Sequence, residues 1–218
     1  MNLYLSSYML GNKINILKKL INYSGSKIAL IPNALDCEEP NNRNQQINEF
    51  LESLNELSFD VKIIDLKKYF GNSIKLIQDL NDFKAVCIMG GNVFVLRKAM
   101  ELSGFDNFLI NNRNNNQMLY LGYSAGICIL GKTLSGLDIV CNPINPYNDS
   151  PANYTGLGLI DYAIAPHYKS NHKSSELIDK VVEYYDCKKI NYKSLKDGEV
   201  ILGRTQPIKQ NNNNERDL

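Results

Sequence analysis

The chain has 218 residues, of which 44% are hydrophobic and 22% charged, and its formal net charge is +1. This profile is that of an ordinary globular protein, and a charge so close to zero provides no basic surface for nucleic acid or an anionic membrane. The five cysteines form no C-x-x-C pair, and no apolar run reaches the roughly 18 residues that cross a bilayer. A disulfide framework, a zinc site and a membrane span are therefore disfavoured, and a cytoplasmic location is expected.

Short apolar segments rich in β-forming residues alternate with longer segments of helical period. This alternation is typical of βαβ units and predicts an α/β fold with a mostly parallel central sheet. We expect one domain over residues 1–206 and a polar, disordered tail over residues 207–218, which holds four consecutive asparagines. Buried strands are predicted at residues 3–6, 27–32, 61–66, 85–89, 118–122 and 162–165, and helices at 13–21, 42–57, 73–80, 93–102 and 174–185.

The turn Met89-Gly90-Gly91-Asn92 follows an apolar strand and opens a helix. Its backbone N–H groups are predicted at the carboxyl edge of the sheet, where ligands bind in α/β folds. Taken alone, this turn is best interpreted as a glycine-rich connection without a ligand. A serine nucleophile nearby would change that interpretation, because acyl transfer needs two donors to an oxyanion.

The segment Gly122-Tyr123-Ser124-Ala125-Gly126 lies between a predicted strand and a predicted helix. A G-x-S-x-G sequence in that context is typical of a nucleophile elbow, where the glycines relieve crowding in a strained turn that exposes the serine oxygen. The pattern alone is common by chance, and a simple tight turn is the alternative. The strand–turn–helix context favours Ser124 as a nucleophile, with the N–H of Ala125 as one oxyanion donor.

The chain has only two histidines, His167 and His172, which limits the choice of a general base. His167 follows an apolar strand and is predicted at the same sheet edge as Ser124. The spacing of the two histidines matches no common metal-ligand pattern, so no metal is expected. For His167 the structural alternative is a packed, hydrogen-bonded histidine.

A carboxylate should orient His167 and stabilise its charged form. Asp149 is preferred, because it lies in the turn-rich loop of residues 134–158 and gives the order Ser, Asp, His that α/β hydrolases use. The competing acids are Asp138, Glu176 and Asp161, the last of which is predicted at the wrong end of its strand.

These motifs resemble the dipeptidase E (aspartyl dipeptidase) family of serine peptidases, which share a three-layer, class I glutamine amidotransferase-like fold. The resemblance extends in order over nearly all of residues 1–206. It is carried by the segments Leu3-Tyr4-Leu5-Ser6-Ser7, Ile31-Pro32-Asn33-Ala34, Gly90-Gly91-Asn92-Val93-Phe94-Val95-Leu96-Arg97, Tyr123-Ser124-Ala125-Gly126, Gly156-Leu157-Gly158-Leu159 and Pro166-His167-Tyr168.

The resemblance implies hydrolysis of small peptides through an acyl-enzyme, without a cofactor. Ser124 would be the nucleophile, His167 the base and an acid between them the third member, while Gly91 and Ala125 would form the oxyanion hole. The related amidotransferases carry cysteine at the elbow, so serine at position 124 favours hydrolysis over amide transfer.

This chain departs from the family in one feature of substrate choice. Classical members read an N-terminal aspartate with an arginine after the histidine, whereas residues 168–176 of this chain contain no arginine. Lys169 and Lys173 are candidate replacements, and Gly90 and Asn92 are expected to lie beside the substrate. A lysine offers a point charge rather than a bidentate clamp.

Alternative functions are a cyanophycinase-like exopeptidase, an amidase for another small acyl compound, or a catalytically silent small-molecule binder. The expected partner is a small peptide, and the sequence leaves a monomer and a homodimer open.

Overall fold

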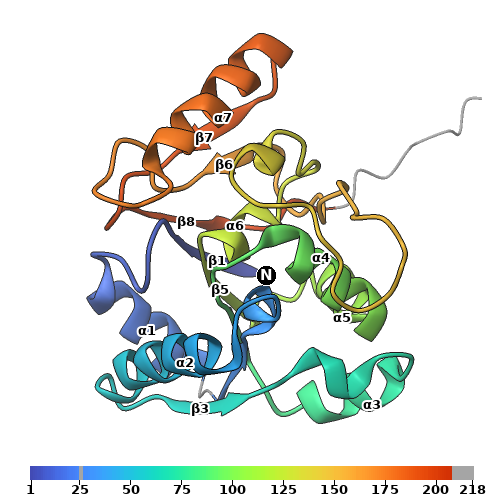
Figure 1. Cartoon of the computed structure of the whole chain (residues 1–218). Helices are drawn as coiled ribbons and strands as arrows, with labels where there is room; N and C mark the ends of the chain where they lie inside the picture. Colours follow the sequence, from blue (N-terminus) through green and yellow to red (C-terminus); the bar gives the residue numbers. More distant parts are fainter. Residues whose placement is uncertain (25–26, 208–218) are drawn as a thin grey trace, which may run out of the picture.

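A computed structural model describes residues 1–24 and 27–207 (Figure 1). Its centre is a six-stranded sheet in the order β3-β2-β4-β5-β1-β8. The first five strands in this order are mutually parallel, and β8 runs antiparallel to β1. The strands are β1 (Asn2–Ser6), β2 (Lys27–Ile31), β3 (Asp60–Ile63), β4 (Ala85–Ile88), β5 (Leu119–Tyr123) and β8 (Val200–Arg204).

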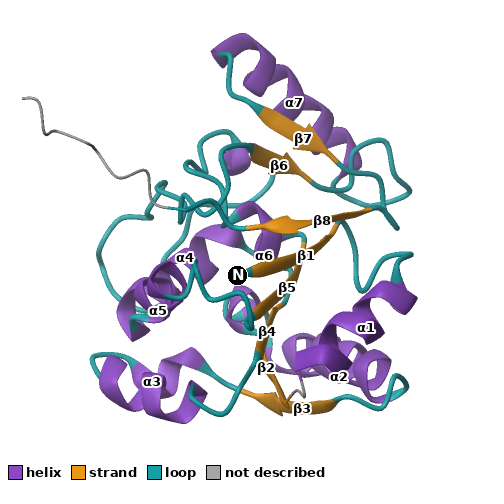
Figure 2. Cartoon of the chain, turned by 180° about the vertical axis from the view of Figure 1, so that it is seen from behind, coloured by secondary structure: helices purple, strands orange, loops and turns teal. Residues whose placement is uncertain are grey.

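Helices cover both faces of this sheet and make three layers (Figure 2). Side chains alternate between the faces, as in β1, where Tyr4 packs against the first two helices while Leu3 and Leu5 join the core on the other side. The first face carries α1 (Ile14–Ser24) and α2 (Pro40–Asn55), and the second carries α3 (Ser73–Leu80), α4 (Val93–Ser103) and α5 (Phe105–Asn111). The predicted α/β architecture is confirmed.

A second, two-stranded parallel sheet lies beyond β8. It consists of β6 (Ala163–Ala165) and β7 (Tyr192–Ser194), connected through α7 (Ser175–Lys188). The expectation that His167 follows a strand of the central sheet is therefore wrong. Its strand β6 pairs with β7 instead, so the histidine approaches Ser124 from a separate unit.

Several element predictions need correction. β3 is an edge strand with mostly exposed side chains, whereas a buried strand was expected there. The sequence pattern also missed α5, β7 and β8, together with the 3-10 turns η1 (Asn33–Leu35), η2 (Leu66–Tyr69) and η3 (Leu137–Ile139). The helix predicted after Ser124 is present as the single-turn α6 (Ala125–Cys128). Residues 208–218 of the expected tail lie outside the described residues. In the described part of the chain, every helix falls short of the length and apolarity that a membrane span requires.

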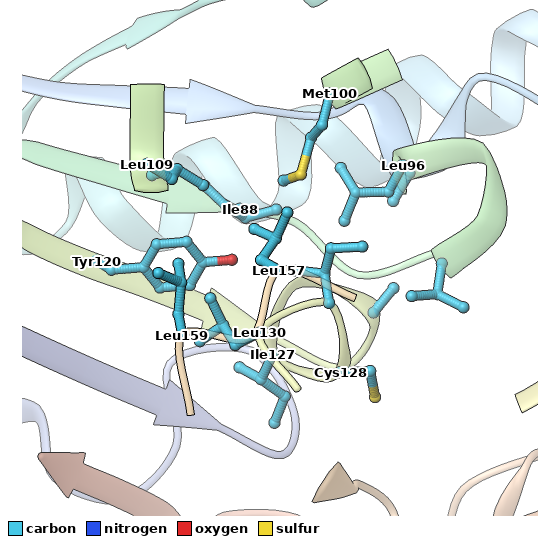
Figure 3. Close-up of a cluster of buried hydrophobic side chains, with 14 of the residues drawn as sticks. Ile88, Leu96, Met100, Leu109, Tyr120, Ile127, Cys128, Leu130, Leu157 and Leu159 are labelled. Carbon is cyan, nitrogen blue, oxygen red and sulfur yellow. The ribbon is translucent and has the colours of Figure 1, made fainter. Parts of the chain in front are cut away.

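A buried cluster underlies the turn after β5 (Figure 3). The ring of Tyr120 is fully buried there, and its hydroxyl donates a hydrogen bond to the carbonyl oxygen of Gly126 in α6. This bond fixes the short helix against the sheet, and the packed side chains around it resist deformation. The labelled members of the cluster include Ile88, Leu96, Met100, Leu109, Ile127, Leu130, Leu157 and Leu159.

Candidate active site

Ser124 occupies a strained turn between β5 and α6. Its backbone has φ 51° and ψ −118°, a conformation that a residue with a side chain rarely adopts. Gly126 makes the turn possible, because a Cβ at that position would lie 2.4 Å from the carbonyl oxygen of Ile88. The strand–turn–helix context predicted for Ser124 is therefore present.

His167 meets Ser124 directly. Its Nε2 lies 2.9 Å from Ser124 Oγ, and only 3% of the residue is exposed. The backbone of His167 is left-handed, with φ 61°, and its N–H donates to Ser7 Oγ at 2.8 Å. The backbone of His167 is thus held beside the end of β1 by this hydrogen bond, while its own strand pairs with β7.

The carboxylate beside His167 belongs to Asp197. Asp197 Oδ1 lies 2.7 Å from His167 Nδ1, so the preference for Asp149 is wrong as a matter of geometry. Asp149 is exposed in the loop between η3 and β6, a loop held over the α4 side by the hydrogen bond from Asn92 Nδ2 to the carbonyl of Asn142. Among the described residues, no hydrogen bond or ion pair joins Asp149 to His167, whose side-chain partners are Asp197 and Ser124.

The other candidate acids are also elsewhere. Asp138 is exposed and accepts a hydrogen bond from the N–H of Gly136 at 3.1 Å. Asp161 is exposed before β6, at the end of the strand remote from His167, as expected. Glu176 is exposed in the first turn of α7, where a carboxylate is favoured by the helix dipole.

The antiparallel direction of β8 explains how Asp197 reaches this edge. Val200 at the start of β8 pairs with Ser6 at the end of β1, so the turn before β8 lies at the carboxyl ends of the parallel strands. Two hydrogen bonds then fix the aspartate: its N–H donates to Ser170 Oγ at 2.8 Å, and its Oδ1 accepts from Ser7 Oγ at 2.9 Å. The sequence signal was the Asp197-Gly198 turn ahead of the apolar run that begins at Val200.

Hydrogen bonding defines the tautomer of His167. An ionised carboxylate can only accept, so Nδ1 carries the proton shared with Asp197, and Nε2 is left to accept from the Ser124 hydroxyl. Burial lowers the pKa of His167 below its ordinary value, and the hydrogen bond and charge of Asp197 oppose that change. The histidine is therefore held neutral and directed as a base toward Ser124.

Gly91 and Ala125, the residues expected to form an oxyanion hole, both line the cavity that contains Ser124. Ala125 is the first residue of α6, where an N–H has no intrahelical acceptor. Gly91 has φ 140°, and a Cβ there would lie 2.5 Å from the Ala34 carbonyl oxygen. Gly90 lies beside the serine, since its Cβ would be 3.0 Å from that of Ser124. Asn92 caps α4 by accepting from the N–H groups of Phe94 and Val95, besides its bond to the neighbouring loop.

A cavity of about 350 Å³ opens above Ser124. Of the two candidate lysines, Lys173 lines this cavity. Lys169 does not, because its ammonium group lies over the ring of Tyr168, 5.1 Å from the centroid. Other lining residues are Tyr8, Glu38, Glu49, Gly90, Asn92 and Cys141. Within residues 1–24 and 27–207, no three His, Cys, Asp or Glu side chains group to hold a metal ion.

Two proteins of Listeria species are related to this chain in sequence. The uncharacterized peptidase Lmo0363 of Listeria monocytogenes is 28% identical over 164 residues, which cover 75% of this chain and 76% of the relative. The uncharacterized peptidase Lin0382 of Listeria innocua is 25% identical over 187 residues, covering 86% and 85%.

Two solved structures share the fold. A Listeria monocytogenes EGD-e protein provisionally named a peptidase E superposes with a TM-score of 0.71 at 23% identity, over 94% of this chain and 98% of that one. A peptidase from an acI-B1 actinobacterium gives a TM-score of 0.67 at 16% identity, over 94% and 83%. The model of peptidase family S51 matches residues 7–210. The chain therefore belongs to peptidase family S51 and is a serine-type peptidase.

Proposed function

We propose that this peptidase cleaves short peptides through an acyl-enzyme on Ser124, with His167 as the general base and Asp197 as the acid that orients it. The observation that carries the proposal is one unbroken chain of contacts: Ser124 Oγ to His167 Nε2 at 2.9 Å, and His167 Nδ1 to Asp197 Oδ1 at 2.7 Å, at the wall of a cavity. Nucleophile, base and orienting acid in that sequence of contacts are the requirements of acyl transfer.

In the proposed reaction His167 Nε2 takes the proton of the Ser124 hydroxyl as Oγ attacks the scissile carbonyl carbon. The N–H groups of Gly91 and Ala125 stabilise the negative charge that develops on the carbonyl oxygen. The imidazolium then gives its proton to the leaving amine as the C–N bond breaks. Water, deprotonated by His167, releases the acyl group and returns the serine.

The size and charges of the cavity favour a short peptide. A cavity of about 350 Å³ is at the small end of ligand sites, which suits a dipeptide better than a folded protein. Glu38 and Glu49 line it and would attract the ammonium group of a free N-terminus. Lys173 would attract the side chain of an N-terminal aspartate, so Asp-X dipeptides are included in the proposed substrates.

A fluorophosphonate probe tests the nucleophile. The wild type should be labelled and Ser124→Ala should not, with thermal unfolding used to verify that both are folded. Equal labelling of the two proteins would contradict the proposal. A folded wild type that is never labelled would instead support a silent binder of the same fold.

A dipeptide panel tests the substrate class. Peptides with one C-terminal residue and a varied N-terminal residue should be cleaved, and acetylation of the amino group should abolish cleavage. Lys173→Met should lower kcat/KM for Asp-X by about threefold to fivefold, as expected for an exposed charge pair. Lys169→Met is the matched control and should leave the Asp-X preference unchanged. An equal loss in both variants would remove Lys173 from substrate recognition.

A further inference from the structure

The second histidine lies directly on the first. The rings of His167 and His172 stack with centroids 3.7 Å apart and an interplanar angle of 8°. Tyr8 meets the rings obliquely, at 5.9 Å from His167 and 5.6 Å from His172. The left-handed backbone at Lys169, with φ 48°, contributes to the bend that returns the chain over the His167 ring. His172 is half-buried and also lines the cavity.

The contacts of His172 define its protonation. The N–H of Ser174 donates to His172 Nδ1 at 3.2 Å. A backbone N–H can only donate, so Nδ1 keeps its lone pair and the proton of the neutral ring is on Nε2. A second proton on this ring would have to displace the Ser174 hydrogen bond.

The charges around His172 oppose that second proton on balance. Burial, the neighbouring His167 and Lys173 lower the pKa of His172, whereas Asp197 raises it. Tyr8 is a further titratable group in contact with the ring. His172 is therefore a neutral aromatic ring stacked on His167, the ring that becomes a cation during acyl transfer.

A neutral ring in this position has two physical effects on His167. The electron-rich face of a neutral ring attracts a cation stacked on it. The His172 ring therefore stabilises the imidazolium form of His167 more than mobile water at the same position would. It also prevents rotation of the ring out of the plane in which Nε2 meets Ser124 and Nδ1 meets Asp197. Small errors in such an alignment cost large factors in rate.

We propose that His172 is a positioning residue whose neutral ring, stacked on His167, holds that ring in line between Ser124 and Asp197. The proposal rests on the proposed function, since it concerns the same base. It assigns a role to the one histidine that the Ser124–His167–Asp197 set does not use.

Two substitutions separate the stack from the local hydrogen bond. His172→Asn keeps an acceptor for the Ser174 N–H but has no ring, and His172→Phe keeps a neutral ring but no acceptor. We expect His172→Asn to lower kcat and the rate of fluorophosphonate labelling by about tenfold or more, with KM changed less than about twofold. His172→Phe should retain kcat within about threefold. Full activity in His172→Asn, or an equal loss in both variants, would overturn the proposal.

Imidazole ¹H–¹⁵N spectra give a readout that needs neither turnover nor a stable variant. The chain has only two histidines, so the two spin systems are separable. At neutral pH His172 should show a proton on Nε2 and none on Nδ1, and His167 the reverse. A protonated His172, or the opposite tautomer, would overturn the positioning role even if Ser124 is labelled. Absent labelling with the expected tautomers would count against the proposed function instead.

Discussion

Asp197 contacts His167 from a position 30 residues later in the chain, with 2.7 Å between Oδ1 and Nδ1. The carboxylate is not buried as deeply as the histidine: 24% of the Asp197 side chain is exposed, compared with 4% for His167. Asp197 Oδ1 also accepts a hydrogen bond from Ser7 Oγ, which fixes the carboxylate beside the ring. It can therefore orient the imidazole and stabilise its charged form.

Asp197→Asn should lower kcat by about a hundredfold or more, because an amide at this position no longer selects the tautomer with a free Nε2 lone pair. Steady-state kinetics on a dipeptide would measure the loss. The matched control is Asp149→Asn, an exposed residue of the irregular loop, which should keep wild-type kcat. A large loss of kcat in Asp149→Asn with wild-type kcat in Asp197→Asn would instead assign the orienting acid to Asp149.

The different outcomes for Ser124 and Asp197 show what a single sequence can reveal. The elbow is local: the strand, the serine and the two glycines are neighbours in sequence, so the pattern predicts the geometry. The contact between Asp197 and His167 depends on the antiparallel pairing of β8 with β1. A local sequence pattern does not predict whether two strands pair in parallel or antiparallel. The short strand β7 shows the same limit, because its pairing with β6 forms the second sheet that positions His167.

The pH dependence should reflect the buried His167. As a base it acts only when neutral, so kcat/KM should be full above its pKa and fall as the pH decreases through it. Burial lowers this pKa, and the acid limb should therefore lie below the ordinary histidine value of about 6.5. In Asp197→Asn the interactions that raise the pKa are lost, so the residual activity should have its limb at a still lower pH. An acid limb that lies at a higher pH in Asp197→Asn than in the wild type would contradict this account.

Gly91→Ala should damage both stability and catalysis. The new Cβ would lie 2.5 Å from the Ala34 carbonyl oxygen, and φ 140° is unsuited to a side chain, so backbone must move. We expect a loss of about 2 kcal/mol in the free energy of unfolding, together with a lower kcat from a displaced donor. Gly203→Ala is the control, because no atom lies within 4 Å of its added Cβ. Urea unfolding of both variants would measure the difference.

Tyr147→Phe should loosen the loop that borders the cavity. The Tyr147 hydroxyl donates to Asp36 Oδ2 at 2.7 Å, and the Asp36 side chain is only 1% exposed. Asp36 keeps its hydrogen bonds from Asn33 and Arg43, so the loss of this donor should cost about 1 kcal/mol of unfolding free energy.

The kinetic signature of Tyr147→Phe should be a higher KM with kcat nearly unchanged. Cys141 and Asn142, earlier in the same loop, line the cavity. The loop itself holds none of the residues Ser124, His167 and Asp197. Tyr184→Phe is the matched control, since the Tyr184 hydroxyl has no hydrogen bond within the part of the chain that the structure describes. A fall in kcat equal to the rise in KM would show that the loop also positions the reacting groups, because a loop that only admits substrate acts on binding alone.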